Sequence, residues 1–230
     1  VALATVVRVR GSSPRPAGAR LAVARSGRMS GAVSAGCVES EVHRRALDVL
    51  DTGKPDLVRF SVTEAPELDV GLSCGGTIDV LIEPFAPGAG GWRVIAEALR
   101  NEQPIVVAEI VEPAELRGAK TSFSANDDAS HDVDPRVATQ EFPAELRTAV
   151  AAEAATLLGV TGGGASSVAV PYAGGEASVF LQSFAVEPWL YIVGGTEIGA
   201  ALCKLAKVLS MRVKIIDPRT PFSARERFPD

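Results

Sequence analysis

Residues 189–219 read WLYIVGGTEIGAALCKLAKVLSMRVKIIDPR, and this stretch decides the fold class of the C-terminal part of the chain. An apolar strand pattern over 189–193 runs into a glycine turn at 194–199, and an amphipathic helix pattern follows as far as Leu209. A second strand pattern over 212–216 ends at an aspartate. Such an order within about 30 residues is typical of the first β-α-β unit of a Rossmann-like dinucleotide-binding domain.

The candidate nucleotide contacts of this unit are Gly194 and Gly199 in the turn and Asp217 after the second strand. Asp217 lies 18 positions beyond Gly199, where a ribose-binding carboxylate belongs. Thr196 departs from the fingerprint, because it puts a side chain where the backbone must approach the pyrophosphate. We therefore expect any NAD(P) binding to be weak. Residues 186–230 give this domain about 45 residues where a complete one needs ~100 or more, so we expect it to be incomplete.

Residues 1–185 favour a separate mixed α+β domain, because strand and helix patterns follow one another there without a regular alternation. The predicted strands are 2–9, 20–24, 31–34, 57–62, 78–82, 104–111, 167–170 and 177–184, and the predicted helices are 38–50, 92–100 and 144–158. Residues 118–140 are polar and poorly periodic, and we expect this segment to be mobile.

Two cysteines of this domain stand in glycine frames, SAGCVE at 34–39 and GLSCGG at 71–76. Glycine lets the backbone approach a ligand, so Cys37 and Cys74 are candidates for thiol chemistry or for ligation of a soft metal. The candidate contacts beside them are Gly36, Gly75 and Gly76. The alternative is ordinary packing, because a free cysteine usually behaves as a small apolar residue. Cys203 lies in an apolar helix pattern and is expected to belong to the core.

The segment 11–18, GSSPRPAG, is stiffened by two prolines and flanked by two glycines. Its Ser13 hydroxyl and Arg15 guanidinium can bind an anionic group, although a stiff connector uses the same residue types. Both cysteine frames begin or end strand-like elements of one domain. We therefore expect Cys37 and Cys74 to lie near one another, at the mouth of a cleft that 11–18 also lines.

The overall composition excludes several classes of protein. The 230 residues are 47% hydrophobic and 22% charged with a net charge of −5, which gives no reason to expect nucleic-acid binding. No apolar run reaches the ~18 residues of a membrane span, and no secretory signal is visible, so the expected compartment is the cytoplasm. The chain starts inside a strand pattern and ends just after one, so we expect a longer polypeptide.

The three cysteines make neither a disulfide framework nor a structural zinc site the favoured interpretation. Their odd number argues against a framework of paired bridges, although a disulfide between Cys37 and Cys74 stays open as a redox state. Structural zinc takes about four Cys or His ligands at short spacing. The further candidates, His43 and His131, fall on a helix pattern and in a polar stretch, where solvated surface is the better interpretation.

Several motifs occur in a fixed order along most of the chain. They are ATVV at 4–7 leading into GSSPRPAG at 11–18, GCVE at 36–39, GLSCGG at 71–76, IDVLIEP at 78–84, and the β-α-β pattern ending at 217–219. Together they resemble the XdhC/CoxI family of xanthine dehydrogenase accessory proteins. Ala35 stands where a glycine is usual in the family, and Gly195, Thr196 and Glu197 replace its small-residue and histidine pattern. The family's usual N-terminal helix and most of its Rossmann domain have no counterpart in these residues.

The resemblance implies a cofactor chaperone rather than an enzyme. Such a protein binds the molybdenum cofactor, protects it while sulfur is placed on molybdenum, and delivers it to a molybdenum hydroxylase of the xanthine dehydrogenase type. The implied partners are that apo-enzyme and a cysteine desulfurase, and the implied state is a homodimer. Cys37 or Cys74 would hold the molybdenum, since thiolate is a soft ligand, or would relay sulfur. The pterin phosphate would dock on 11–18 with Arg15, or at the helix start after Cys37.

Two other functions stay open at this point. The first is an NAD(P)-linked oxidoreductase that uses the Asp217 domain, although the sequence offers no hydride-transfer acid or base for it. The second is a thiol redox protein that uses Cys37 and Cys74. Their separation of 37 residues, in place of a Cys-x-x-Cys pair, argues against the second.

Overall fold

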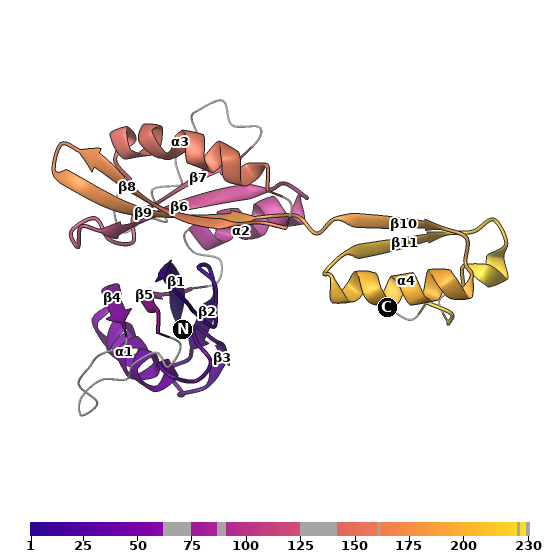
Figure 1. Cartoon of the computed structure of the whole chain (residues 1–230), viewed down its shortest axis with the longest axis horizontal. Coiled ribbons are helices and arrows are strands. Elements are labelled where there is room, and N and C mark those ends of the chain that lie inside the picture. Colours follow the sequence, from indigo (N-terminus) through magenta and orange to yellow (C-terminus); the bar gives the residue numbers. More distant parts are fainter. Residues whose placement is uncertain (62–74, 87–90, 125–141, 161, 225, 229–230) are drawn as a thin grey trace. The chain divides into compact units, whose positions relative to one another are not determined.

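The computed structural model describes residues 1–61, 75–86, 91–124, 142–160, 162–224 and 226–228. The chain divides into two compact units, Val1–Ala185 and Val186–Asp230. Figure 1 shows two sheets with their helices in the first unit and a smaller strand and helix unit at the C-terminal end.

The first sheet of the larger unit has five strands in the order β3-β2-β1-β5-β4, and every pairing is antiparallel. Its strands are β1 (Ala2–Arg10), β2 (Arg20–Val23), β3 (Met29–Gly31), β4 (Asp56–Phe60) and β5 (Thr77–Pro84), and helix α1 (Glu39–Thr52) lies between β3 and β4 in the sequence. The predicted strand over 31–34 is therefore wrong, because the strand ends at Gly31 and Ser34 lies in the following loop. The predicted helix over 38–50 is confirmed within two residues at its end.

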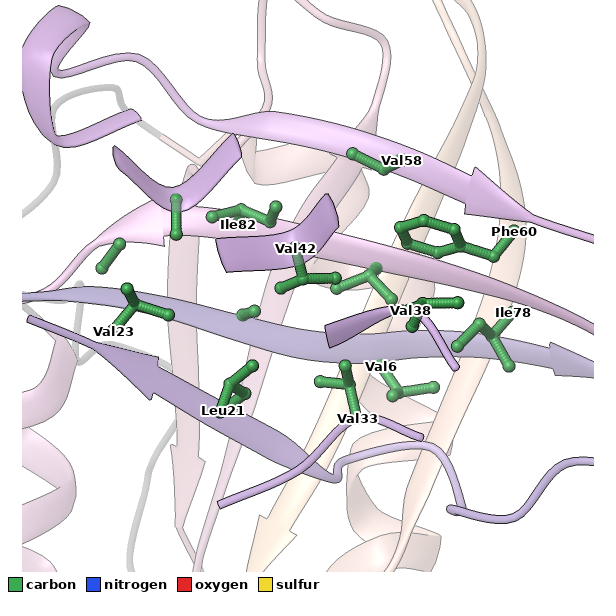
Figure 2. Packing of buried hydrophobic residues seen from close by; sticks show 14 of the residues in the cluster. Val6, Leu21, Val23, Val33, Val38, Val42, Val58, Phe60, Ile78 and Ile82 are labelled. Atoms are coloured by element: carbon green, nitrogen blue, oxygen red, sulfur yellow. The ribbon is translucent and has the colours of Figure 1, made fainter. Parts of the chain in front are cut away.

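One face of the first sheet packs against α1 and forms the core of this part. Alternate residues of β1 and β5 point to this face, as the two-residue period of a strand requires. Residues 34–37 form the loop that carries Cys37, here called the Cys37 loop. Figure 2 shows Val33 and Val38, which flank this loop, beside Val6 and Ile78 in the cluster. The loop that carries Cys37 is thus fixed at both ends by buried valines.

The second sheet has four antiparallel strands in the order β7-β6-β9-β8. Its strands are β6 (Ile105–Glu112), β7 (Lys120–Ser124), β8 (Ala165–Tyr172) and β9 (Gly175–Phe184). Helix α2 (Gly91–Arg100) precedes β6 in the sequence, and α3 (Ala144–Leu158) lies between β7 and β8. The predicted hairpin across Gly174 and Gly175 is present as β8 and β9. Apolar residues of α3 cover one face of this sheet.

The prediction of a mobile segment over 118–140 is wrong at its start. Lys120–Ser124 forms β7, which pairs with β6 along five residue positions. Its buried Thr121 accepts a hydrogen bond from the guanidinium of Arg147, which explains how so polar a strand is accommodated. Residues 125–140 lie outside the described residues.

The two sheets of the larger unit meet through a small apolar layer. It consists of Val7 and Leu81 from the first sheet and Val111 and Phe180 from the second. These side chains point away from the helix-covered faces, so each sheet is buried on both sides at this place. Charged and polar residues flank the layer at both ends.

The smaller unit is a parallel β-α-β unit, as predicted. Strands β10 (Trp189–Val193) and β11 (Arg212–Ile216) pair in parallel, and α4 (Glu197–Val208) connects them. A short 3-10 helix, η1 (Thr220–Phe222), follows. Across both units, none of the helices in the described ranges is long and apolar enough to cross a membrane.

Candidate functional site

The predicted site segments meet at one edge of the first sheet. β1 ends at Arg10 directly opposite Thr77, where β5 begins, so the segment 11–18 starts beside Gly76. A side chain at Gly76 would lie 1.8 Å from the carbonyl oxygen of Ser12, so this position accepts only glycine. The last glycine of the second frame, Gly76, therefore lies against the start of the 11–18 segment. Cys74 lies outside the described residues.

The Cys37 loop reaches the same edge from β3, which lies on the opposite side of β1 from β5 in the strand order. β3 runs in the direction of β1, because both pair antiparallel with β2. Just beyond β3, the N–H of Ala32 donates to the carbonyl of Arg20, and the carbonyl of Ala32 accepts from Arg15 Nε at 3.5 Å. The loop before Cys37 thus touches the 11–18 segment.

A network around Ser34 and Glu39 organises the backbone at Cys37. The buried Ser34 hydroxyl accepts from the N–H groups of Gly36 at 3.2 Å, Cys37 at 3.1 Å and Val38 at 3.4 Å, and it donates to Glu39. The carboxylate of Glu39 also accepts from Ser34 N at 2.8 Å. The Cys37 loop is therefore held by its own neighbours in the sequence.

Glu39, the first residue of α1, is therefore part of the network that holds the loop before the helix. Partial burial acts to raise the pKa of Glu39, but the hydrogen bonds from Ser34 and the backbone outweigh it and leave the pKa below its ordinary value. An ionised carboxylate therefore lies at the start of α1. This arrangement counts against the predicted phosphate dock at the helix start, because the carboxylate at this place is an anion and would repel a phosphate.

Cys37 itself is half-buried and packs partly against the core cluster. Gly36 beside it has φ = +103° and open space where a side chain would be, so the backbone on this side is accessible. Gly75 is also exposed, with φ = +81° and open space around it. The predicted accessible glycines thus exist at Gly36 and Gly75, whereas Gly76 is needed for packing.

Ser13 and Arg15 lie in the 11–18 segment as predicted, and the segment braces itself. The Ser13 hydroxyl donates to the carbonyl of Arg15 at 2.8 Å and accepts from its N–H at 3.4 Å, which is a short serine turn. Arg15 is exposed. Within the described ranges, no group of three or more His, Cys, Asp or Glu residues is placed to hold a metal ion.

The turn of the smaller unit has a different construction from the predicted fingerprint. Thr196 is the N-cap of α4, and its hydroxyl accepts from Gly199 N at 3.3 Å. A side chain at Gly199 would lie 2.8 Å from the carbonyl of Gly194, so Gly199 provides close packing of helix on strand. A side chain at Gly195 would meet the carbonyl of Phe222 at 1.7 Å. Thr196, which interrupts the fingerprint, thus caps the N-terminus of α4.

Asp217 is already bound within the chain. Its carboxylate accepts from Gly195 N at 2.8 Å and from Arg219 N at 2.9 Å, and the Arg219 guanidinium contacts both oxygens. The Arg219 guanidinium, with the N–H of Gly195, holds the pKa of Asp217 well below its ordinary value. A ribose hydroxyl would have to compete with these partners for the carboxylate. Cys203 on α4 is half-buried, so its assignment to the core is wrong.

Sequence reasoning missed an open cleft next to the shared edge. The cleft has a volume of about 730 Å³ and is lined by Arg8, Val9, Arg10, Glu112, Pro113, Ser167, Ala169, Glu176 and Ser178. None of the predicted site residues lines it, although Arg10 directly precedes the 11–18 segment. The available signal was the pair of arginines within a β-strand pattern, since charged residues are rarely placed on two successive inward positions.

Comparisons with known proteins give similar proteins for parts of the chain. The sequence profile of the XdhC and CoxI family matches residues 1–61. The chain is 38% identical over 103 residues to the molybdenum cofactor insertion chaperone PaoD of Escherichia coli (strain K12), covering 45% of this chain and 32% of that protein. It is 36% identical over 83 residues to a probable xanthine dehydrogenase subunit of Bacillus subtilis (strain 168), covering 35% of this chain and 25% of that protein. The matches thus span a third or less of these relatives.

The fold has a solved counterpart. The structure of a xanthine dehydrogenase from Bacillus halodurans superposes with a TM-score of 0.65 at 20% identity, covering 99% of this chain and 61% of that one. At this identity the likeness supports the mixed α/β fold alone. The matched residues 1–61 contain the 11–18 segment, the Cys37 loop and α1, whose geometry forms the shared edge. The predicted resemblance is therefore confirmed over residues 1–61, which match the XdhC and CoxI family.

Proposed function

We propose that this chain binds the molybdenum cofactor and delivers it to an apo-enzyme of the xanthine dehydrogenase type. The observation that carries this proposal is the meeting of three segments at one sheet edge: the Cys37 loop, the 11–18 segment and Gly75–Gly76. The name of the Escherichia coli relative, a molybdenum cofactor insertion chaperone, supports it. The cofactor is cargo in this proposal, and the chain holds and releases it without transforming it.

Each residue type at the edge suits a different part of this cargo. Cys37 offers a sulfur ligand of the soft kind that molybdenum accepts, and we propose the same role for Cys74, which lies outside the described residues. The open glycines, Gly36 and Gly75, let a flat ligand approach the backbone, and Gly76 holds the edge together. Ser13 and Arg15 offer a hydroxyl and a cation to its polar groups.

The proposal also assigns partners. The apo-hydroxylase receives the cofactor, a cysteine desulfurase supplies the sulfur that the molybdenum needs, and the chaperone acts as a homodimer in the cytoplasm. The site lies at the ends of strands, where loops are exposed, which leaves room for a partner protein to take the cargo.

The direct test is cofactor retention by the protein purified from a molybdenum-replete host. We expect the parent to carry molybdenum and a fluorescent oxidised pterin, and at least one of Cys37→Ser and Cys74→Ser to lose most of both. Cys203→Ser is the matched control, since that thiol lies in the smaller unit. If both cysteine variants retain the cofactor as well as the parent, neither thiol is a ligand.

Dinucleotide binding by residues 186–230 is the weaker alternative, and the contacts of Asp217 count against it. We expect calorimetry with NAD, NADP and AMP to show weak or no binding, because Arg219 and Gly195 already occupy the carboxylate. Tight NAD(P) binding that survives Asp217→Ala would show that the nucleotide site lies elsewhere and would favour an oxidoreductase.

A further inference from the structure

Two strands, one from each sheet, contain an irregularity at the same place. The pairing of β1 with β5 moves from Val6–Val80 to Arg8–Asp79, which leaves Val7 as an extra residue. The pairing of β6 with β9 moves from Ile110–Val179 to Glu112–Ser178, which leaves Val111 as an extra residue. Both extra valines lie in the apolar layer between the sheets. The two bulges therefore face the same interface.

The bulges decide which side chains reach this interface. Side chains alternate along a strand, so Arg8 and Glu112 would otherwise point into the helix-covered cores. The extra residue instead puts each of them on the same face as the valine before it. There Arg8 Nη1 lies 3.9 Å from Glu112 Oε2 and 3.2 Å from Asp79 Oδ2. Bulges commonly re-aim side chains next to functional sites.

The walls of the resulting cleft carry opposite charges. Arg8 and Arg10 line the β1 wall, whereas Glu112 and Glu176 line the wall from the second sheet. Asp79 does not cancel the positive charge, because Arg59 also holds it, at 2.7 and 3.1 Å. A ligand that fits both walls has an anionic group at one end and hydrogen-bond donors at the other.

Several polar groups of the cleft remain available to such a ligand. Arg10 is exposed, and its guanidinium makes no hydrogen bond or ion pair with the residues that the structure describes. The Ser178 hydroxyl accepts from Arg8 and so keeps its own proton to donate. Glu176 is exposed as well. Arg8 is fixed by Asp79 and Ser178, so the cationic wall is ordered before anything binds.

We propose that this cleft binds a phosphate monoester carried on a planar heterocycle with N–H donors. The phosphate meets Arg10 and Arg8, and the N–H groups of the heterocycle meet the carboxylates of Glu112 and Glu176. This inference rests on the proposed function, because a pterin phosphate has this chemistry, and so do guanine nucleotides. Since Arg10 leads directly into the 11–18 segment, a ligand in the cleft lies near the start of that segment, where Gly76 packs against Ser12.

The test uses guanosine 5′-monophosphate as the probe, with guanosine and inorganic phosphate as its separate halves. We expect calorimetry to show that the whole probe binds more tightly than either half. Arg10→Ala should weaken its binding about tenfold, since hydrogen bonds to charged groups contribute on that order. Arg28→Ala is the matched control, because Arg28 is an exposed arginine outside the cleft. Glu176→Gln should weaken binding of the nucleotide but not of phosphate.

The outcomes separate this inference from the proposed function. The assignment of this ligand to the cleft is overturned if Arg10→Ala and Arg28→Ala bind the probe equally well, or if the probe binds no more tightly than phosphate. If the parent retains the molybdenum cofactor and Arg10→Ala retains it equally, the function stands and the cleft assignment is wrong. If the nucleotide binds through Arg10 while the parent retains no pterin, the cleft is a nucleotide site and the proposed function fails.

Discussion

The apolar layer between the two sheets has one closed polar end and one open polar end. At the closed end Lys120 lies between Glu83 and Glu109, with Nζ 2.6 Å from Glu109 Oε1, and all three side chains are almost fully buried. Arg20 binds Gln182 and lies over the rings of Trp92 and Phe184. The cavity there has about 10 Å³, against about 730 Å³ at the open end.

The difference shows how the same residue types serve two purposes. At the closed end Lys120 binds Glu83 across the interface and Glu109 within its own sheet, so the cluster fixes how the sheets pair and excludes solvent. At the open end Arg8 is paired but Arg10 and Glu176 face the cleft. Buried charges tend to specify one arrangement, whereas accessible ones are available to a ligand. Four substitutions test this division.

Lys120→Met should have the largest effect on stability. It removes the cation between two buried carboxylates, and breaking such a group costs about 3–5 kcal/mol. Urea unfolding of the variant measures the loss, with the exposed Lys54→Met as the matched control. A loss below about 1 kcal/mol would show that the closed end does not hold the sheets together.

Glu109→Gln should change how stability depends on pH. Burial, together with repulsion from Glu83, raises the pKa of Glu109 from 4.5 to about 7 against the attraction of Lys120. As the pH rises through this window, the unfolded chain loses the proton first, so the free energy of unfolding falls. The fall amounts to as much as roughly 3 kcal/mol and should be absent from the variant. Unfolding measured at several pH values between 5 and 8 checks this, and an unchanged slope would contradict it.

Arg8→Met at the open end should be milder than Lys120→Met. Asp79 would keep both contacts with Arg59, and Arg8 itself is 22% exposed, so we expect a loss of about 1–2 kcal/mol. The same urea experiment with Arg28→Met as control measures it. A loss as large as that of Lys120→Met would mean that both ends are structural.

Arg10→Ala should have the smallest effect on stability. An exposed side chain without described partners contributes within about 0.5 kcal/mol, so the unfolding midpoint should stay that of the parent. Ligand binding should nevertheless weaken. A clear loss of stability would indicate that Arg10 has a structural partner and would remove the distinction between the two ends.

Much of the architecture follows from local sequence pattern. The β-α-β unit, the helix after Cys37 and the β8–β9 hairpin were predictable, because their apolar periods and glycine turns act over a few residues. β7 was not, since Lys120–Ser124 has no apolar run and becomes a strand by pairing with β6. Thr196 was predictable as a helix cap but was interpreted through the nucleotide fingerprint.

The sequence by itself determined which residue types the candidate site offers: the cysteine frames with their glycines and the proline-stiffened 11–18 segment. The tertiary structure decided what those residues can still bind. Ser34 and Glu39 take up the N–H groups beside Cys37, and Arg219 takes up Asp217. It also decided toward which face of the sheet the side chains of Arg8 and Glu112 point. Each follows a bulge, which forms only by pairing with another strand and reverses the alternation of side chains expected for a regular strand.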